Sequence, residues 1–363
     1  MIPVTATPRK PAGDRRILFF ADAGSAVGGG HVMRCLTLAR ALRERGAVCG
    51  FVASPAVSGI LNAFGAEGIE QVRATGERAA MVLTAARDWP ADAVVIDHYR
   101  FARADEAVLR APGRVLMVID DLRRAHDCDL VLDSNLGRTE VDYPGIQTLA
   151  GPAFALVRPE FVALREATPA RRAPGEPPRR LLISLGLTDV GGVTARVIEA
   201  LMPDLGDLSV DVVLGEGAAS LERLRSLAAG DARVRLHINT QQMPALTAEA
   251  DLAIGAGGSS TWERCCLGLP TVTVVLADNQ RPNALALAAA GAALMIEAAA
   301  ADFEDRLRVM FMELINDSAR RHAVGQAAAI LCDGRGAERV ADGLLALAGR
   351  ETPSPARGEG RPR

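Results

Sequence analysis

Residues 17 to 42 read ILFFADAGSAVGGGHVMRCLTLARAL. The stretch opens on an apolar run typical of a buried strand, and it ends on a segment in which Val32, Cys35 and Ala39 share one helical face. Between the two lies a turn with the consecutive glycines Gly28 to Gly30. Strand, glycine-rich turn and helix in this order predict the first unit of a parallel α/β sheet.

A second glycine-rich turn repeats this arrangement. Residues 250 to 270 read ADLAIGAGGSSTWERCCLGLP, in which Gly257, Gly258, Ser259 and Ser260 follow a predicted strand and precede a helix. Glycines let the backbone approach a ligand closely, while free N–H groups and hydroxyls donate hydrogen bonds to an anion. These four residues are therefore candidates for holding a diphosphate without a metal ion.

Apolar runs alternate with amphipathic segments along the whole chain, which predicts an α/β protein with two Rossmann-like parallel sheets. Ligands bind at the carboxyl ends of such strands, so two sheets facing each other would enclose a cleft. The expected strands are 17–21, 49–53, 93–97, 115–120, 130–132, 181–185, 210–214, 234–238, 252–254 and 271–275.

The chain has 363 residues, more than one hydrophobic core usually serves, so two domains are expected. Residues 168–180, TPARRAPGEPPRR, contain four prolines and predict a solvated linker between a domain at 15–167 and another at 181–349. The ends, 1–14 and 350–363, lack an apolar face and are expected to be disordered.

Composition excludes several classes of function. A net charge of -3 and 4% aromatic residues argue against a nucleic-acid partner. The six cysteines have no disulfide or C-x-x-C spacing, and the first residues resemble no secretion signal, so we expect buried thiols and a cytoplasmic location. A monomer is expected, although the residues do not determine the oligomeric state. The apolar window 284–301 is interrupted by Gly291 and Glu297, which predicts a helix, a turn and a strand rather than a membrane span.

His31 stands where the first predicted helix begins. A helix N-terminus disfavours imidazolium, so this histidine is suited to act as a general base, although it could also only cap the helix or pack locally. Gly29 and Gly30 would let the ligand approach, and Arg34 lies one turn along, facing either a phosphate or solvent. The turn lacks the Lys-Ser/Thr of a Walker A loop and has Met33 where a Rossmann fingerprint needs glycine, so no nucleotide cofactor is expected.

Other polar residues also follow predicted strands. Tyr99 follows Asp97 and His98, and Asp120 and Asp121 end the next strand, which would bring them to the same cleft. Asn279 and Gln280 suit the hydroxyl and acetamido groups of a sugar, or only form a turn.

Glu263 has two interpretations. Ser260 and Glu263 have the spacing of a capping box, but a carboxylate there could equally accept hydrogen bonds from ribose hydroxyls.

A metal site is not expected. Asp127-Cys128-Asp129 matches the D-x-D pattern of metal-dependent glycosyltransferases, but the pattern is short, common by chance and placed before a strand, so we interpret it as structural. His126, His237 and His322 have no zinc-ligand spacing.

Several motifs occur together in this chain: GGGHVMRCLTLA, VVIDHY, IDDLRRAHDCDLVLDSN and GAGGSSTWERCCLGLPTV, followed by NQ. Together they resemble one family, the UDP-2,4-diacetamido-2,4,6-trideoxy-beta-L-altropyranose hydrolases of pseudaminic acid biosynthesis. These enzymes serve flagellin glycosylation and share the GT-B fold of the glycosyltransferase that makes lipid II. The resemblance runs from about residue 16 to 345.

The resemblance implies hydrolysis of a UDP-linked diacetamido sugar, with inversion and without a metal. His31 would activate water, Tyr99 and Asn279 would hold the sugar and the water, and UDP would lie on residues 257–263. One departure concerns the family's S-x-G-G-x-D loop, because this chain has Leu187 in place of the second glycine. Ser184, Gly186 and Asp189 are carried over as substrate-binding candidates, with a loop that Leu187 narrows.

Two further functions remain open at this stage. A GT-B glycosyltransferase would transfer the sugar to an acceptor, and a nucleotide-sugar binding module would not catalyse at all. All three functions need the same UDP site, and the residues alone do not fix the stereochemistry of the sugar or its N-substituents.

Overall fold

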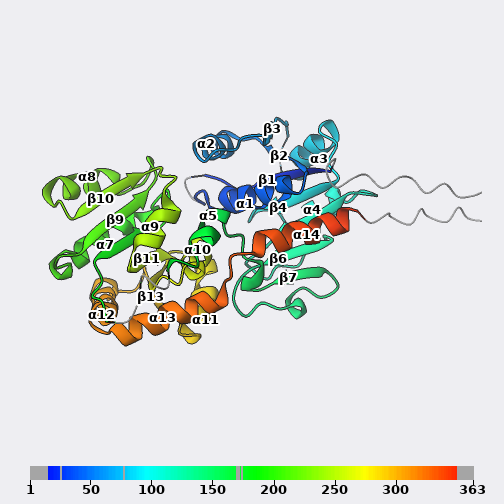
Figure 1. Cartoon of the computed structure of the whole chain (residues 1–363). Coiled ribbons are helices and arrows are strands. Elements are labelled where there is room, and N and C mark those ends of the chain that lie inside the picture. The colour runs from blue at the N-terminus through cyan, green and yellow to red at the C-terminus, as the bar shows by residue number, and fades with distance from the viewer. Residues whose placement is uncertain (1–14, 25–26, 77, 169–171, 173–174, 350–363) are drawn as a thin grey trace, which may run out of the picture.

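The computed structural model describes residues 15–24, 27–76, 78–168, 172 and 175–349. Two parallel sheets lie side by side, each covered by helices on both faces (Figure 1). The expected α/β fold with two Rossmann-like sheets is confirmed. Both expected disordered ends lie outside the described residues.

The first sheet has seven strands in the order β3-β2-β1-β4-β5-β6-β7. The strands are β1 (Arg16–Ala21), β2 (Val48–Val52), β3 (Glu70–Val72), β4 (Ala93–Asp97), β5 (Val115–Ile119), β6 (Leu130–Asp133) and β7 (Gln147–Ala150). The helices of this half of the chain are α1 (Gly30–Glu44), α2 (Pro55–Ala63), α3 (Arg78–Asp88), α4 (Arg103–Leu109) and α5 (Pro159–Leu164).

The second sheet has six strands in the order β10-β9-β8-β11-β12-β13. The strands are β8 (Arg180–Ser184), β9 (Ser209–Leu214), β10 (Val234–Ile238), β11 (Leu252–Ala256), β12 (Thr271–Val275) and β13 (Leu294–Glu297). The helices are α7 (Val193–Leu201), α8 (Leu221–Gly230), α9 (Met243–Glu249), α10 (Ser260–Cys266), α11 (Arg281–Ala289), α12 (Phe303–Asn316), α13 (Ser318–Leu331) and α14 (Gly336–Ala348).

All ten expected strands are present, with boundaries shifted by no more than two residues at either end. Two strands, β3 and β7, were not expected. Both are short, lie at the edges of the first sheet and are largely exposed or half-buried, so neither carries the apolar run that marks a buried strand. The window 284–301 forms helix α11, a turn at Gly291 and strand β13, as predicted.

Two helices cross between the sheets. The segment leading into α5 packs through Ala155, Val157 and Phe161 into the core beneath α10 of the second sheet. The last helix, α14, instead returns to the first sheet and packs against α1 (Figure 1). Its Val340 and Leu344 are fully buried in the core of the first sheet. The two crossing connections touch, because a Cβ on Gly336 would overlap the backbone of Ala155.

The exchange of these helices bears on where one domain ends and the next begins. The division at 168–180 stays a prediction, and we propose to assign α5 to the second unit and α14 to the first. Part of the linker lies outside the described residues. Within the described part, Arg172 and Arg180 contact the second unit, whereas a linker surrounded by solvent was expected. Arg172 donates to the carbonyl of Ala250, and Arg180 pairs with Asp211 of β9.

The remaining sequence expectations concern cysteines and membranes. All six cysteines are buried and unpaired, as expected. Among the described residues, no helix combines the length and the apolar character needed to span a bilayer.

If α14 is an integral part of the first core, Leu344→Ala should lower the free energy of unfolding by about 2–5 kcal/mol, the usual range for a leucine removed from a tightly packed interior. Asp342→Ala on the same helix is the control, because it removes only an exposed ion pair with Arg45 and should cost about 1 kcal/mol or less. Urea unfolding measures both variants. Equal, small losses would contradict the packing role of α14.

Candidate functional site

A cleft of about 390 Å³ lies between the two sheets, at the carboxyl ends of their strands. Its walls come from the segments that follow β1, β4 and β5 on one side and β8, β11 and β12 on the other. The predicted site residues that line the cleft are Gly29, Gly30, His31, Arg34, Tyr99, Ser184, Gly186, Gly258, Ser259, Ser260, Glu263, Asn279 and Gln280. Gly257 and Asp189 do not line it.

His31 lies at the start of α1 with its ring against the buried carboxylate of Asp97. Its Nδ1 is 2.6 Å from Asp97 Oδ1, and Asp97 is 1% exposed at the end of β4. The two residues meet because β1 pairs with β4, which places Ala21, just before the glycine turn, opposite Asp97. Strand order therefore builds a His–Asp pair from residues far apart in the sequence.

The protonation of this pair follows from its surroundings. Burial alone would raise the pKa of Asp97, but the charges and hydrogen bonds of Arg34 and His31 hold that pKa far below its usual range. The carboxylate is therefore ionised, so the proton in the short contact belongs to Nδ1, which donates to Asp97. Among the described residues, none forms a hydrogen bond with Nε2. The lone pair of this nitrogen is therefore available to accept a proton from a molecule in the cleft.

Arg34 reinforces the same carboxylate. Its Nε donates to Asp97 Oδ2 and its second terminal nitrogen to Oδ1, both at 2.6 Å. Burial lowers the pKa of Arg34, but Asp97 outweighs that effect and raises it well above its usual value. The guanidinium lines the cleft; two of its three nitrogens hold Asp97, and the third donates to Asp121 at 3.4 Å.

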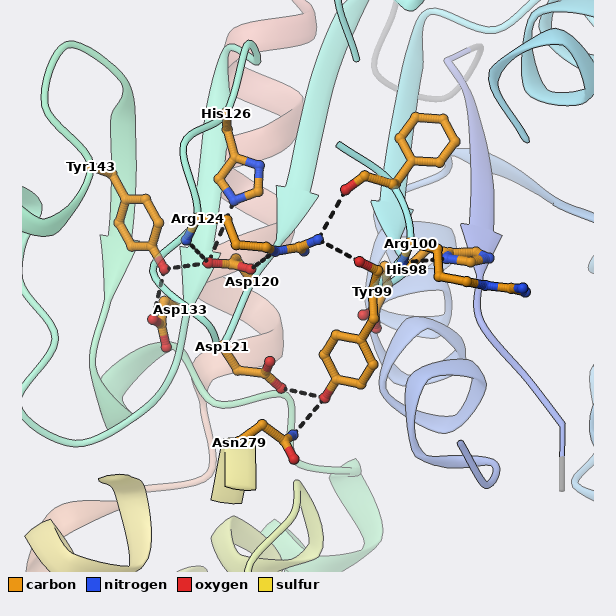
Figure 2. A network of polar contacts seen from close by, with 12 residues as sticks. His98, Tyr99, Arg100, Asp120, Asp121, Arg124, His126, Asp133, Tyr143 and Asn279 are labelled. Carbon is orange, nitrogen blue, oxygen red and sulfur yellow. Dashed lines mark hydrogen bonds and ion pairs between the residues drawn. The ribbon is translucent and has the colours of Figure 1, made fainter. Parts of the chain in front are cut away.

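Tyr99 connects the two halves of the cleft (Figure 2). Its hydroxyl donates to Asp121 Oδ2 at 3.0 Å and accepts from Asn279 Nδ2 of the second unit at 2.7 Å. Burial, with Asp121 nearby, raises the pKa of Tyr99, so the phenol stays protonated. The ring also packs edge-on against His31, with 4.5 Å between ring centroids. The other oxygen of Asp121, Oδ1, is buried without a hydrogen-bond partner among the described residues.

A buried network stands behind this wall and fixes the backbone that carries it. Arg124 donates to the carbonyls of Tyr99 and Phe101 and pairs with Asp120 (Figure 2). Asp120 also accepts from Tyr143, whose hydroxyl contacts Asp133 as well. The polar side chains of the network are thereby tied to the loops that present Tyr99 and Asp121 to the cleft.

His126 completes the network. It contacts Glu106 at 2.8 Å, and its Nε2 lies 3.5 Å from Asp120, close enough for an ion pair but not aligned for a hydrogen bond. Burial lowers the pKa of His126, but the two carboxylates outweigh it and raise the pKa to about 9. His126 is therefore a structural cation.

The second glycine turn presents unused hydrogen-bond donors to the cleft. Gly258, Ser259 and Ser260 line it, and no acceptor among the described residues engages their backbone N–H groups. The turn lies close to the first one, since a Cβ on Gly30 would be 3.8 Å from the hydroxyl of Ser259. Gly257 does not line the cleft, because the side chain of Gln280 packs over it. The side-chain oxygen of Gln280 accepts from Leu276, which stabilises its own turn.

Glu263 does not close a capping box. Both of its oxygens accept from Arg158, at 2.7 and 3.2 Å, and both side chains line the cleft. Burial lowers the pKa of Arg158, and Glu263 raises it by more. Sequence reasoning missed Arg158 because it stands in an irregular segment of the first half of the chain and reaches the second unit only through the crossing of α5.

The loop after β8 has residues that line the cleft and one residue, Asp189, that is buried away from it. Ser184, Gly186 and Leu187 line the cleft, and Leu187 lies against Gly29, so the departure from two glycines brings the loops of the two units together. Asp189 is fully buried and accepts hydrogen bonds from Thr194 and from the backbone of Ser220. Its carboxylate therefore shapes the loop, and it does not line the cleft in which a ligand was expected.

The D-x-D aspartates have structural partners, as interpreted from the sequence. Asp129 pairs with Arg110 at 2.6 Å and accepts from the backbone of Leu116, and Asp127 lies 3.8 Å from the same arginine. Within the described part of the chain, no group of three or more His, Cys, Asp or Glu side chains is arranged to hold a metal ion.

Comparison with known proteins gives one domain family and several relatives. Residues 200–339 match the glycosyltransferase family 28 C-terminal domain. The chain is 31% identical to a UDP-N-acetylglucosamine--N-acetylmuramyl-(pentapeptide) pyrophosphoryl-undecaprenol N-acetylglucosamine transferase of Salinibacter ruber, over 66% of this chain and 67% of that protein. It is 24% identical to the UDP-2,4-diacetamido-2,4,6-trideoxy-beta-L-altropyranose hydrolase of Campylobacter jejuni, over 76% of this chain and 97% of that protein.

Two further comparisons extend this result. The spore coat polysaccharide biosynthesis protein SpsG of Bacillus subtilis is 27% identical over 52% of this chain, and the match spans little more than half of that protein, 56%. Among solved structures, Acinetobacter baumannii MurG superimposes with a TM-score of 0.65 at 19% identity, covering 92% of this chain and 99% of that one. The GT-B fold is thereby confirmed.

The elevated pKa of His126 predicts a stability that depends on pH. A histidine whose pKa is higher in the folded than in the unfolded chain stabilises the fold fully below about pH 6.5, and the contribution disappears as the pH passes about 9. The free energy of unfolding of the wild type should therefore exceed that of His126→Gln at pH 6, and the difference should shrink towards pH 10. A constant difference across this range would show that the imidazolium does not contribute.

Proposed function

The chain belongs to the family that includes the Salinibacter transferase and the Campylobacter hydrolase, and we propose that it hydrolyses a UDP-linked diacetamido-trideoxy sugar to UDP and free sugar. Its second unit contains the glycosyltransferase family 28 C-terminal domain. The substrate class follows the Campylobacter relative, which is matched over nearly its whole length. The single observation that supports catalysis is the His31–Asp97 pair, whose free nitrogen faces a cleft lined by anion-binding groups.

The proposed chemistry is a single displacement at the anomeric carbon. Nε2 of His31 takes a proton from water while the water oxygen forms a bond to that carbon and the bond to the UDP oxygen breaks. UDP leaves as an anion, so no strong general acid is needed at the leaving oxygen. Attack from the face opposite the leaving group inverts the anomeric configuration.

Asp97 and Arg34 have a positioning role in this mechanism. The hydrogen bond from Nδ1 to Asp97 fixes the ring and its tautomer, and the ionised carboxylate stabilises the imidazolium that forms when Nε2 takes the proton. Arg34 keeps Asp97 ionised and stops it from turning towards solvent. The sugar would then meet a base that is oriented before it binds.

In this proposal UDP binds to the second unit. The free N–H groups of Gly258, Ser259 and Ser260 suit the diphosphate, because a cluster of backbone donors stabilises an anion without a metal. Glu263, held by Arg158, offers carboxylate oxygens to the ribose hydroxyls. We propose that Arg158 orients Glu263 for this contact.

The sugar lies between the units in this proposal. The unpaired Oδ1 of Asp121 would accept a hydrogen bond from the N–H of an acetamido group. A buried carboxylate oxygen without a partner costs free energy until a ligand donates a hydrogen bond to it. Tyr99 and Asn279, which bond each other across the cleft, would open to receive the sugar and then hold it together with the attacking water.

Transfer to an acceptor is the second candidate, favoured by the 31% identity to the transferase of Salinibacter ruber. Both reactions use the same UDP site and differ in whether water or an acceptor hydroxyl reaches the anomeric carbon. The third candidate is a binding module without catalytic activity, in which His31 would take part in no reaction.

Incubation with a panel of UDP-diacetamido sugars in buffer, without any acceptor, separates the first two functions. Hydrolysis predicts UDP and free sugar in equal amounts, detected by mass spectrometry, with the first anomer of the sugar opposite to that of the substrate by NMR. Release of UDP only after an acceptor is added would establish transfer and exclude the hydrolase.

Removal of the base tests the mechanism. His31→Asn should lower turnover by about 10² to 10⁴, the usual contribution of a general base, while the affinity for UDP changes by less than about threefold. His237→Asn is the matched control, because that histidine, on the edge strand β10, pairs with Asp211 of β9 and does not itself line the cleft. Turnover of His31→Asn within tenfold of the wild type would rule out His31 as the base.

A further inference from the structure

Arg264 lies directly behind the second glycine turn and is 2% exposed. Its guanidinium donates to the carbonyl of Ala256 at 2.7 Å and to the hydroxyls of Ser260 and Thr261, both at 3.1 Å. Its Nε has no hydrogen-bond partner among the described residues. The side chain is therefore attached to the inner side of the turn whose outer side lines the cleft.

In the described part of the chain no carboxylate pairs with this charge, and the neighbouring Glu263, which acts on it electrostatically, is itself paired with Arg158. Among the described residues, none forms an ion pair with Arg264, whereas Arg34 pairs with Asp97 and Arg158 pairs with Glu263. Burial without such a partner lowers the pKa of Arg264 to about 10. A fully buried and uncompensated cation is rare, because taking a charge out of water is costly unless an opposite charge offsets it.

The packing around Arg264 is built for a guanidinium. Gly255 leaves the space in which it lies, since a Cβ there would overlap the group. The three oxygens that Arg264 contacts are neutral, so they satisfy its donors without cancelling its charge. The positive field therefore persists at the surface of the turn, where Gly258, Ser259 and Ser260 meet the cleft.

We propose that Arg264 supplies the positive charge that binds the diphosphate of the nucleotide, acting through the glycine turn and without touching the ligand. The missing counter-ion is the ligand itself: an anion on the cleft side of the turn compensates the buried charge. This inference rests on the proposed function, because it takes the turn as the place where the diphosphate of UDP binds.

Binding of uridine and of UDP distinguishes the charge of Arg264 from its effect on the shape of the turn. Uridine carries no phosphate, so its affinity depends on the ribose and base contacts alone. UDP adds the diphosphate, and the ratio of the two affinities reports on the field at the turn. Lysine can supply the charge but not the fixed geometry of the three hydrogen bonds, so a side chain that only supports the turn would not be replaced by Arg264→Lys.

The experiment measures binding of UDP and uridine to the full-length protein by isothermal titration calorimetry, for the wild type, Arg264→Met and Arg264→Lys. Arg264→Met should weaken UDP binding at least tenfold and change uridine binding by less than twofold, while Arg264→Lys should keep UDP affinity within about fivefold. The thermal shift produced by saturating UDP should fall in the same order.

Arg165→Met is the matched control. Arg165 also donates to backbone carbonyls, those of Cys266, Ala329 and Cys332, but it does not line the cleft. Its removal should leave the ratio of UDP to uridine affinity unchanged. Equal loss of UDP and uridine binding in Arg264→Met, or UDP binding within twofold of the wild type, would overturn the inference.

Inorganic pyrophosphate separates a failure of this inference from a failure of the proposed function. If the wild type binds pyrophosphate but not UDP, and Arg264→Met loses pyrophosphate binding, the charge assignment stands and the nucleotide substrate is wrong. If Arg264→Met does not fold, Arg264→Lys and Gly255→Ala carry the test. Gly255→Ala keeps the charge but displaces it, and it should weaken UDP more than uridine.

Discussion

The buried carboxylate of Asp97 is the interaction on which the site depends. It ends β4 beside the glycine turn that follows β1, and it binds His31 and Arg34 of α1 at the same time. Without its charge the imidazole would lose its orientation and the guanidinium would be buried without a partner. One acidic residue thus fixes the position of the His31 ring, its tautomer and the direction in which its free nitrogen points.

The same constraint links the two units. Tyr99 follows Asp97 by two residues, so the strand that positions the carboxylate also presents the hydroxyl that Asn279 contacts across the cleft. The crossing of α5 and α14 joins the units a second time, because each helix completes a core that belongs to the other half of the chain. The cleft is consequently a junction of two interdependent folds.

Periodicity and turn chemistry predicted the fold well, since buried parallel strands carry continuous apolar runs and glycine turns mark where they end. They also placed His31 at the mouth of the cleft. The pairing with Asp97 was beyond their reach because it depends on strand order, which brings together residues that local patterns treat separately. Arg158 and Asp189 show the same limit: their partners are set by a helix crossing and by loop packing.

Both glycine turns are therefore parts of one arrangement around the cleft, with the oriented imidazole of His31 on one side and free backbone N–H donors on the other. The most direct test is to carry out the reaction in water enriched in ¹⁸O and to locate the label by mass spectrometry. Attack by water on the anomeric carbon predicts one ¹⁸O in the released sugar and none in UDP. Label in the β-phosphate of UDP would mean that water attacks phosphorus, and it would contradict the placement of His31 as the base at the sugar carbon.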